Sequence, residues 1–267
     1  MNKRLFWRLL WPVRMYIRYS PIGRGKGFLT RHLLRPLYPQ EKKFRAHLPT
    51  GGTVELNHEE TLGECFYLYG SFEKPELLYM SKAINQGSTV IDVGANIGLF
   101  TIVMAQATGP KGRVFAVEPL TSNIERLKAN VVSNNLDNVS IIPFAAGAVD
   151  GETSLYLASD GAYGSTLEAN DFSTGQVTRV PMARMDRIWN ETGTPRIEAM
   201  KIDVEGGELA VLEGCKSLLQ ACRPLILIEA NTAEHLDRLK NWLSKLGYVH
   251  SHPSGFRDWN HIFEVKL

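Results

Sequence analysis

The chain has 267 residues, of which 44% are hydrophobic, so it is long enough to bury the core of one large domain with an extension. Its three cysteines, Cys65, Cys215 and Cys222, form no C-x-x-C pair and no zinc-ligand pattern. This excludes a cysteine-held iron–sulfur cluster and predicts a reducing compartment. The net charge of +2 is unevenly distributed: residues 1–47 hold 12 Lys or Arg and one acid, which leaves 18 bases and 27 acids in the other 220 residues.

Residues 1–20 are predicted to form a basic amphipathic helix, since five Lys or Arg fall within an arc of about 140° on a helix. The arginines exclude both a transmembrane span and a cleavable signal peptide. Trp7 and Trp11 favour a helix lying in the interface of an anionic membrane, although Pro12 should kink it. The alternative is that its apolar face docks on the protein itself or on a partner. Residues 21–47 are predicted to be a basic linker with a short helix.

Residues 48–70 are expected to hold a short strand and then an irregular or helical stretch. A helix is predicted over residues 71–85, because Pro75 suits its first turn and apolar residues follow at helical spacing. Phe72 and Glu73 begin this segment. The default role for Glu73 is a first-turn acid that complements the helix dipole.

Residues 89–101, T-V-I-D-V-G-A-N-I-G-L-F-T, predict a buried strand, a glycine turn and the start of a helix. Such a turn lets a ligand approach the backbone closely. The spacing of Gly94 and Gly98 departs from the G-x-G-x-x-G pattern of dinucleotide sites, and Asp92 stands two residues before the first glycine. A carboxylate there would repel a pyrophosphate and suit a cation. S-adenosylmethionine, which carries an ammonium and a sulfonium but no phosphate, is such a ligand.

A second strand is predicted over residues 113–119 and ends near Glu118, about 20 residues beyond the glycine turn. A carboxylate at that point can accept hydrogen bonds from ribose hydroxyls, a feature that NAD sites share. A third strand is predicted over residues 139–146, and its end should bring Phe144 or Ala145 to an adenine ring.

Residues 150–187 lack helical periodicity, and two alternating segments joined by a polar loop predict a β-hairpin insertion at about 150–185. Long polar loops over a site usually select the substrate. Tyr163 and Ser165 are candidates for contact with a sugar, the alternative being that they lie on a hairpin without a binding role. Asp186 is expected to cap a helix.

Residues 199–208, A-M-K-I-D-V-E-G-G-E, predict a fourth strand, a glycine turn and a helix. Lys201, Asp203 and Glu205 alternate and should share one face of the strand. Ionisable groups are seldom buried unless they are paired, so this cluster is either a paired scaffold or a site. Residues 224–230 predict a fifth, apolar strand.

Strands that alternate with helices predict an α/β, doubly wound, mostly parallel seven-stranded sheet covered on both faces. If the fourth strand returns to the far side of the first, the strand order reverses between these two. Ligands bind in the crevice at such a point, beyond the carboxyl ends of the strands. The glycine turn and the acidic string of the fourth strand both end there.

The string D-V-G-A-N-I-G at 92–98 resembles the first motif of class I methyltransferases. Together with V-E-P at 117–119, K-I-D-V-E-G-G-E at 201–208 and the aromatic–Glu pair at 72–73, it makes the chain resemble the FkbM family over roughly residues 70–230. The resemblance implies a Rossmann-like methyltransferase domain over residues 48–267. It also implies S-adenosylmethionine as cofactor and O-methylation of a sugar, glycan or other hydroxylated metabolite. We assign cofactor binding to Asp92, Gly94, Asn96, Gly98, Glu118, Phe144 and Ala145.

Methylation of a hydroxyl requires alignment of the oxygen and removal of its proton. Asp203 or Glu205 is the predicted base, Lys201 would tune or orient it, and Glu208 is a lesser candidate. The competing interpretation is structural, with Glu205 and Glu208 at a helix N-terminus and Asp203 bracing the loop. We predict no metal site, since no complete ligand set can be identified. No D/N-P-P-Y string occurs, which argues against methylation of amino groups.

Two other functions compete with this hypothesis. An RNA ribose methyltransferase could use residues 1–47 as its arm, although we do not expect a nucleic-acid partner. A non-catalytic S-adenosylmethionine-binding membrane adaptor is the third possibility. We expect a cytoplasmic protein with peripheral contact at the inner membrane face through residues 1–20. The methyl acceptor depends on residues 48–70 and 150–185, in which we find no transferable pattern.

Overall fold

The computed structural model describes residues 12–13, 15–16, 29, 43–58, 60–158, 164–165 and 173–265. Most of the predicted amphipathic helix over residues 1–20 lies outside the described residues, and so does most of the hairpin tip, including Tyr163. Their roles stay predictions. Within the described ranges, no helix combines the length and the apolar character that crossing a membrane requires.

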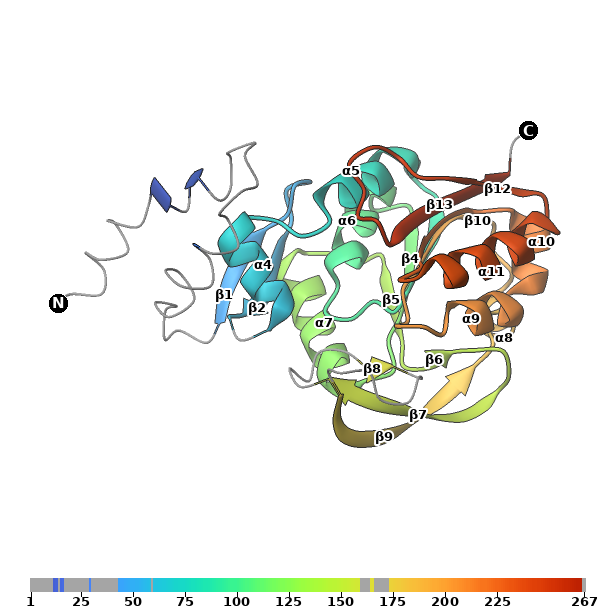
Figure 1. The fold of residues 1–267 in the computed structure, drawn as a ribbon. Helices are drawn as coiled ribbons and strands as arrows, with labels where there is room; N and C mark the ends of the chain where they lie inside the picture. Colours follow the sequence, from blue (N-terminus) through green and yellow to red (C-terminus); the bar gives the residue numbers. More distant parts are fainter. Residues whose placement is uncertain are drawn as a thin grey trace.

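Seven strands form the central sheet in the order β12-β13-β11-β10-β3-β4-β5 (Figure 1). They are β3 (Thr89–Val93), β4 (Arg113–Val117), β5 (Val139–Ile142), β10 (Ile197–Ile202), β11 (Leu225–Glu229), β12 (Tyr248–Ser251) and β13 (Asn260–Val265). Strands β3, β4, β5, β10 and β11 pair in parallel, whereas β13 is antiparallel to β11 and to β12. The predicted doubly wound sheet is confirmed, and the order reverses between β3 and β10 as expected.

Helices cover both faces of this sheet, because successive residues of each buried strand point to opposite sides. Val90 of β3 packs in the core shared with α5 and α6, while its neighbour Ile91 packs in the core shared with α8 to α11. The first layer consists of α5 (Lys74–Ala83), α6 (Leu99–Thr108) and α7 (Thr121–Ser133). The second consists of α8 (Met185–Glu191), α9 (Glu208–Gly214), α10 (Lys216–Cys222) and α11 (Ala233–Ser244).

The third predicted strand is shorter than expected. Strand β5 ends at Ile142, and Ala145–Ala146 form β6, which pairs with the insertion instead of continuing the central sheet. The helix predicted after residue 208 is divided into α9 and α10 at Cys215. Asp186 caps a helix as expected, but the helix is α10: its carboxylate accepts hydrogen bonds from the backbone N–H groups of Ser217 and Leu218 at 2.9 and 2.8 Å.

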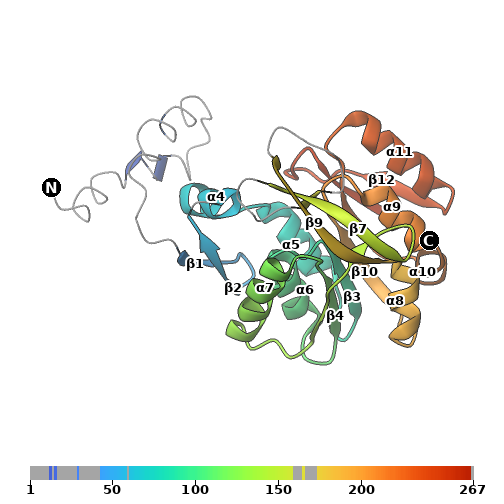
Figure 2. The ribbon, with the colours of Figure 1, turned by 90° about the horizontal axis from the view of Figure 1, so that it is seen from below.

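The insertion is the predicted antiparallel hairpin, formed by β7 (Gly151–Ala158) and β9 (Ser173–Ala183). With β6 and the short β8 (Gly164–Ser165) it makes a separate four-stranded sheet. This sheet lies along the lower side of the molecule in Figure 1 and in front of the central sheet in Figure 2. Its inward face therefore flanks the ends of the central strands.

The segment before the central sheet is anchored on α7. Strand β1 (Lys43–His47) pairs with β2 (Thr53–Asn57), so the hairpin runs across the domain boundary predicted between residues 47 and 48. The backbone N–H of Glu55 donates to Asn130 on α7 at 2.9 Å. Arg126 on α7 holds Glu60 through two hydrogen bonds of 2.7 and 2.8 Å, just before α4 (Thr61–Tyr69) begins. These contacts fix α4 beside the carboxyl ends of the strands.

Candidate active site

A cavity of about 330 Å³ opens at the carboxyl ends of β3, β4 and β10, where the strand order reverses. Its wall combines the glycine turn after β3, the segment after β4, the segment around β6, and the turn after β10. Thr153, Leu155 and Met182 of the hairpin close one side, and Leu62 of α4 with Phe72 closes another. The crevice predicted from strand order is therefore present.

The glycine turn brings its backbone against the turn that follows β10. Gly94 has φ +76°, and a Cβ atom added to it would overlap the backbone carbonyl oxygen of Asp203. Only glycine allows both this conformation and this approach. Asn96 also has a positive φ of 50°, and its side-chain Oδ1 is buried in the cavity wall with no hydrogen-bond partner among the described residues. Gly98, with φ +99°, packs against Leu127 and does not line the cavity.

Glu118 follows β4 and is 4% exposed, at the cavity wall. Its carboxylate accepts hydrogen bonds from the backbone N–H groups of Asn96 at 2.9 Å and Leu120 at 3.0 Å, and from the Asn123 amide at 3.2 Å. Burial raises the pKa of Glu118, and these donors partly oppose that rise. A carboxylate has about four acceptor positions, so roughly one is left for a ligand hydroxyl.

Lys201 is the centre of a buried ion-paired group. Its Nζ lies 3.1 Å from Asp203 Oδ2 and 3.8 Å from Asp92 Oδ1, and it donates to the Gly94 carbonyl at 3.0 Å. Asp92 and Lys201 are neighbours because they are paired in the register of β3 and β10. Burial lowers the pKa of Lys201, but the charges of Asp203 and Asp92 outweigh it, so the net pKa lies above the ordinary value. The ammonium therefore stays charged.

Asp92 lies behind the glycine turn and is fully buried. Its Oδ2 accepts a hydrogen bond of 2.6 Å from Thr101 on α6, and burial raises its pKa. Unlike Asp203, it does not line the cavity. Its direct contact is with Lys201, through which it positions the site.

The turn after β10 departs from the predicted strand alternation. Strand β10 ends at Ile202, and Glu205 adopts a positive φ of 56°, so Lys201, Asp203 and Glu205 do not continue along one regular strand face. All three nevertheless line the cavity. Glu208 is 1% exposed and accepts hydrogen bonds from the backbone N–H groups of Val204 and Gly206 at 3.0 and 3.1 Å. Glu208 therefore holds the turn and is not part of the wall.

Asp203, Glu205 and Glu229 form an acidic cluster at the ends of β10 and β11, with carboxylate oxygens within 4.8 Å of one another. Burial, together with the charges of Asp203 and Glu205, raises the pKa of Glu229 to about 11. A protonated Glu229 can share its proton with Asp203, which relieves the repulsion between the carboxylates. Acidic groups commonly cluster without an ion, so the expectation of no metal stays a prediction.

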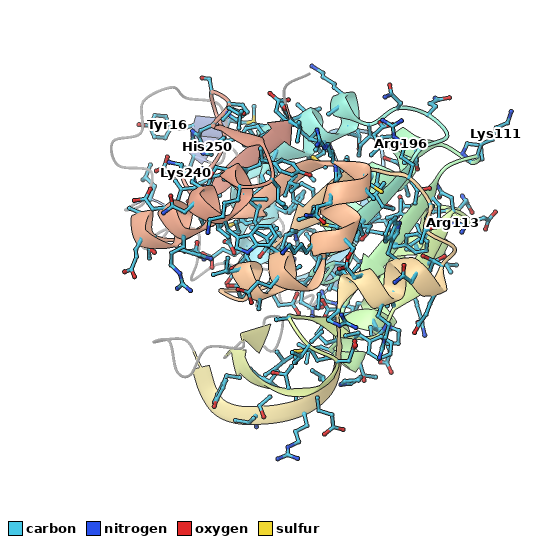
Figure 3. All side chains as sticks on the ribbon, turned by 90° about the vertical axis from the view of Figure 1, so that its right-hand side faces the viewer. Tyr16, Lys111, Arg113, Arg196, Lys240 and His250 are labelled. Carbon is cyan, nitrogen blue, oxygen red and sulfur yellow. The ribbon has the colours of Figure 1, made fainter. Side chains whose placement is uncertain are left out.

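Charge is unequally distributed between the two edges of the central sheet. Among the described residues, the cavity wall at the carboxyl edge contains one basic side chain, Lys201, and four acids: Glu73, Glu118, Asp203 and Glu205. Lys111, Arg113 and Arg196 are exposed and lie at the amino ends of β4 and β10, on the edge away from the hairpin (Figure 3). A wall with this excess of acids favours a cationic ligand.

Eight of the ten predicted site residues line the cavity: Gly94, Asn96, Glu118, Phe144, Ala145, Lys201, Asp203 and Glu205. Glu73, expected by default to be a first-turn acid, was not assigned to the site. It stands at the N-cap of α5 without a side-chain capping bond, is 7% exposed, and lines the cavity. The aromatic–Glu pair at 72–73 was the signal that could have found it. The apolar hairpin positions were not predictable, since alternation alone does not say which face meets the cavity.

A family model described as the methyltransferase FkbM domain matches residues 92–249. The chain belongs to the FkbM methyltransferase family. Enzymes of this family use S-adenosylmethionine as the methyl donor. The match includes the glycine turn, Glu118 and the turn after β10, which are the parts of the FkbM domain that meet at the cavity.

The FkbM domain has relatives in several proteins. The AMB antimetabolite synthetase AmbE of Pseudomonas aeruginosa is 26% identical over 254 residues, which are 78% of this chain and 12% of that protein. The 31-O-demethyl-FK506 methyltransferase FkbM of Streptomyces tacrolimicus is 28% identical over 197 residues, 62% of this chain and 74% of that protein. The crystal structure of Methyltransferase FkbM from Methylobacillus flagellatus KT shares 18% identity at a TM-score of 0.47 and covers 74% of this chain and 52% of that chain.

The cavity of the FkbM domain fits the donor chemically. The remaining acceptor position of Glu118 suits a ribose hydroxyl, and the unpartnered Oδ1 of Asn96 suits an ammonium or hydroxyl donor. Phe144 lines the cavity, and its ring centroid lies 5.3 Å from the guanidinium carbon of Arg187. The excess of carboxylates suits the positive sulfonium and ammonium.

Proposed function

We propose that this chain is an S-adenosylmethionine-dependent O-methyltransferase whose acceptor is a hydroxyl of a sugar, glycan or other hydroxylated metabolite. One observation carries the proposal: a single cavity is lined both by Glu118, a carboxylate suited to accept a ribose hydroxyl, and by the Lys201–Asp203 ion pair. The printed name of the Streptomyces tacrolimicus relative refers to methylation of an oxygen, which supports the choice of acceptor atom.

The donor supplies an electrophilic methyl group, and the chain has to align the acceptor oxygen and take its proton. The carboxylate of Asp203 is 32% exposed at the cavity and is held by Lys201, so it is placed to accept a hydrogen bond from the acceptor hydroxyl. The apolar side chains of Leu62 and Phe72 exclude water from this side. In this proposal Asp203 orients the hydroxyl, and Asp203 and Glu205 remain candidate bases.

Donor binding is tested through Glu118. We expect Glu118→Gln to raise the dissociation constant of S-adenosylmethionine about 10-fold to 100-fold, since hydrogen bonds to charged groups contribute about 1.5–3 kcal/mol. Isothermal titration calorimetry of wild-type protein and variant measures this effect. The matched control is Glu191→Gln, the same change at a side chain that is 65% exposed on α8, which should leave the affinity unchanged. Equal affinities in all three proteins would contradict the assigned role.

The acceptor is tested by incubating cell-envelope, lipid, small-metabolite and RNA fractions with methyl-labelled S-adenosylmethionine. We expect label in a fraction that contains hydroxylated metabolites or glycans. Asp203→Asn should slow the incorporation by about 10²-fold or more, the usual contribution of a group that orients or deprotonates the nucleophile. Label confined to RNA would overturn the proposed acceptor class, and tight donor binding without any labelling would indicate a binding protein.

A further inference from the structure

We propose that Glu73 is the group that takes the proton from the acceptor hydroxyl. This inference rests on the proposed O-methyl transfer and identifies a base that the sequence did not suggest. Glu73 lines the same cavity as Lys201 and Asp203 but comes from a different element, at the start of α5. A hydroxyl oriented by Asp203 would thus meet a second carboxylate.

Glu73 has an uncommon backbone conformation at the start of α5. The residue adopts φ +46° and ψ +38°, a left-handed conformation that costs a non-glycine residue about 1–2 kcal/mol. Its backbone carbonyl begins α5 by accepting from Leu77 at 2.9 Å, while its side chain turns away from the helix N-terminus. Strain of this kind persists where the surrounding structure enforces it, which is frequent at functional sites.

The surroundings of Glu73 hold one carboxylate oxygen and leave the other for the cavity. Oε1 accepts from the Asn260 amide at 2.8 Å and lies 3.4 Å from the Trp259 indole nitrogen, both at the start of β13. Among the described residues, no hydrogen bond is made to Oε2. Since Glu73 lines the cavity, this oxygen is the one available to a ligand. The carboxylate is therefore oriented before an acceptor binds.

The charges around Glu73 favour a base that works near neutral pH. Burial and the negative charges of Asp203 and Glu76 raise the pKa of Glu73 to about 7, against the lowering effect of Asn260 and Lys201. Nearby titratable groups include Cys65 of α4, whose pKa is raised by burial and by the charge of Glu73, and Arg257, whose guanidinium lies over the Trp259 ring at 5.5 Å. A base is most effective when its pKa lies near the working pH.

Asp203 is held in an ion pair by Lys201, whose ammonium lies 3.1 Å away, so in this proposal Asp203 orients the hydroxyl and Glu73 takes the proton. In the proposed step Glu73 Oε2 accepts the hydroxyl proton, and the oxygen electron pair forms the new O–CH₃ bond. The electron pair of the S–CH₃ bond stays on sulfur, which leaves neutral S-adenosylhomocysteine. The protonated Glu73 then returns its proton to solvent.

The first test is calorimetric and needs no known acceptor. Binding of the cationic donor should favour ionised Glu73, so S-adenosylmethionine should release up to about half a proton at pH 7 from a group with a pKa near 7. The release is obtained by titration in buffers of different ionisation enthalpy. S-adenosylhomocysteine carries the same amino and carboxylate groups without the sulfonium charge, so it should release clearly less.

Glu73→Gln retains an oxygen that can accept from Asn260, and it should abolish the difference in proton release between the two ligands. Glu205→Gln should keep that difference, and its loss there would overturn the assignment. Asp203→Asn removes a charge that raises the pKa of Glu73, so it should move the proton release to lower pH without abolishing it. Asn260→Leu removes a hydrogen bond that lowers the pKa of Glu73, so it should move the proton release to higher pH. This second variant tests the assignment even if Glu73→Gln fails to fold.

The second test uses the cell fraction that takes up methyl label in the acceptor experiment described above. At saturating donor, Glu73→Gln should reduce methyl incorporation about 10²-fold to 10⁴-fold. Wild-type incorporation should rise with pH through 7, and this rise should disappear in the variant. Full incorporation by Glu73→Gln would overturn the role of Glu73 as the base but not the proposed methyl transfer. Failure of wild-type protein to bind S-adenosylmethionine would instead overturn the proposed function.

Discussion

Gly94→Ala is expected to abolish measurable binding of S-adenosylmethionine and to lower the free energy of unfolding by more than about 2 kcal/mol. The new Cβ atom would overlap the backbone carbonyl of Asp203, and the φ of +76° is unfavourable for alanine. Because neither backbone segment can move without separating β3 from the turn after β10, both halves of the cavity should be displaced. Urea unfolding and calorimetric titration with the donor measure the two effects.

The matched control for Gly94 is Gly87→Ala. Gly87 has a similar φ of +83°, but a Cβ atom there would meet nothing within 4 Å. In this variant only the unfavourable backbone conformation should lower the free energy of unfolding, by about 1–2 kcal/mol, and donor binding should be normal. If the two variants lose equal stability and both keep donor binding, the close approach between the two turns has no role in the site.

Lys201→Met is expected to lower the free energy of unfolding by about 3–5 kcal/mol, because it leaves the fully buried Asp92 without its counter-charge. The loss should be measured by urea unfolding between pH 5 and 8. Without Lys201 the pKa of Asp92 in the folded protein rises further above its unfolded value. The folded variant then binds more protons than the unfolded chain, so its stability should fall as the pH rises.

Two variants control the interpretation of Lys201→Met. Adding Asp92→Asn removes the unpaired charge and should restore more than half of the lost stability. Lys43→Met breaks an ion pair of 2.9 Å to Glu55, close to the 3.1 Å between Lys201 and Asp203. Both side chains of this pair are about half exposed or more, so its effect should stay below about 1 kcal/mol. An equally small effect of Lys201→Met would show that the buried pair does not stabilise the fold.

The parts of the fold that were predictable depend on local patterns. Alternation of apolar strands with periodic helices indicates the doubly wound sheet, and the glycine spacing with its preceding acid indicates a cationic nucleoside ligand. Strand order alone predicts that the glycine turn at 92–98 and the acidic turn at 201–208 meet. The FkbM match confirms the family, whereas the acceptor hydroxyl is still a proposal.

The parts that were not predictable depend on distant contacts. Asp92 faces Lys201 because of the register between β3 and β10, which no local pattern reveals. Glu205 leaves the strand alternation because the backbone turns after Ile202. Glu73 has the local appearance of a helix-start acid, and its environment is set by Asn260, which is separated from it by 187 residues.

The hydrogen bond between Glu73 and Asn260 has a consequence for the newly made protein. A ribosome has to add 187 residues after Glu73 before Asn260 exists, whereas the glycine turn, Glu118 and the turn after β10 are already synthesised by then. Domains generally fold as units during synthesis. A nascent chain that stops before β13 would therefore already contain the groups assigned to the methyl donor, while the carboxyl group of Glu73 would still lack its partner Asn260.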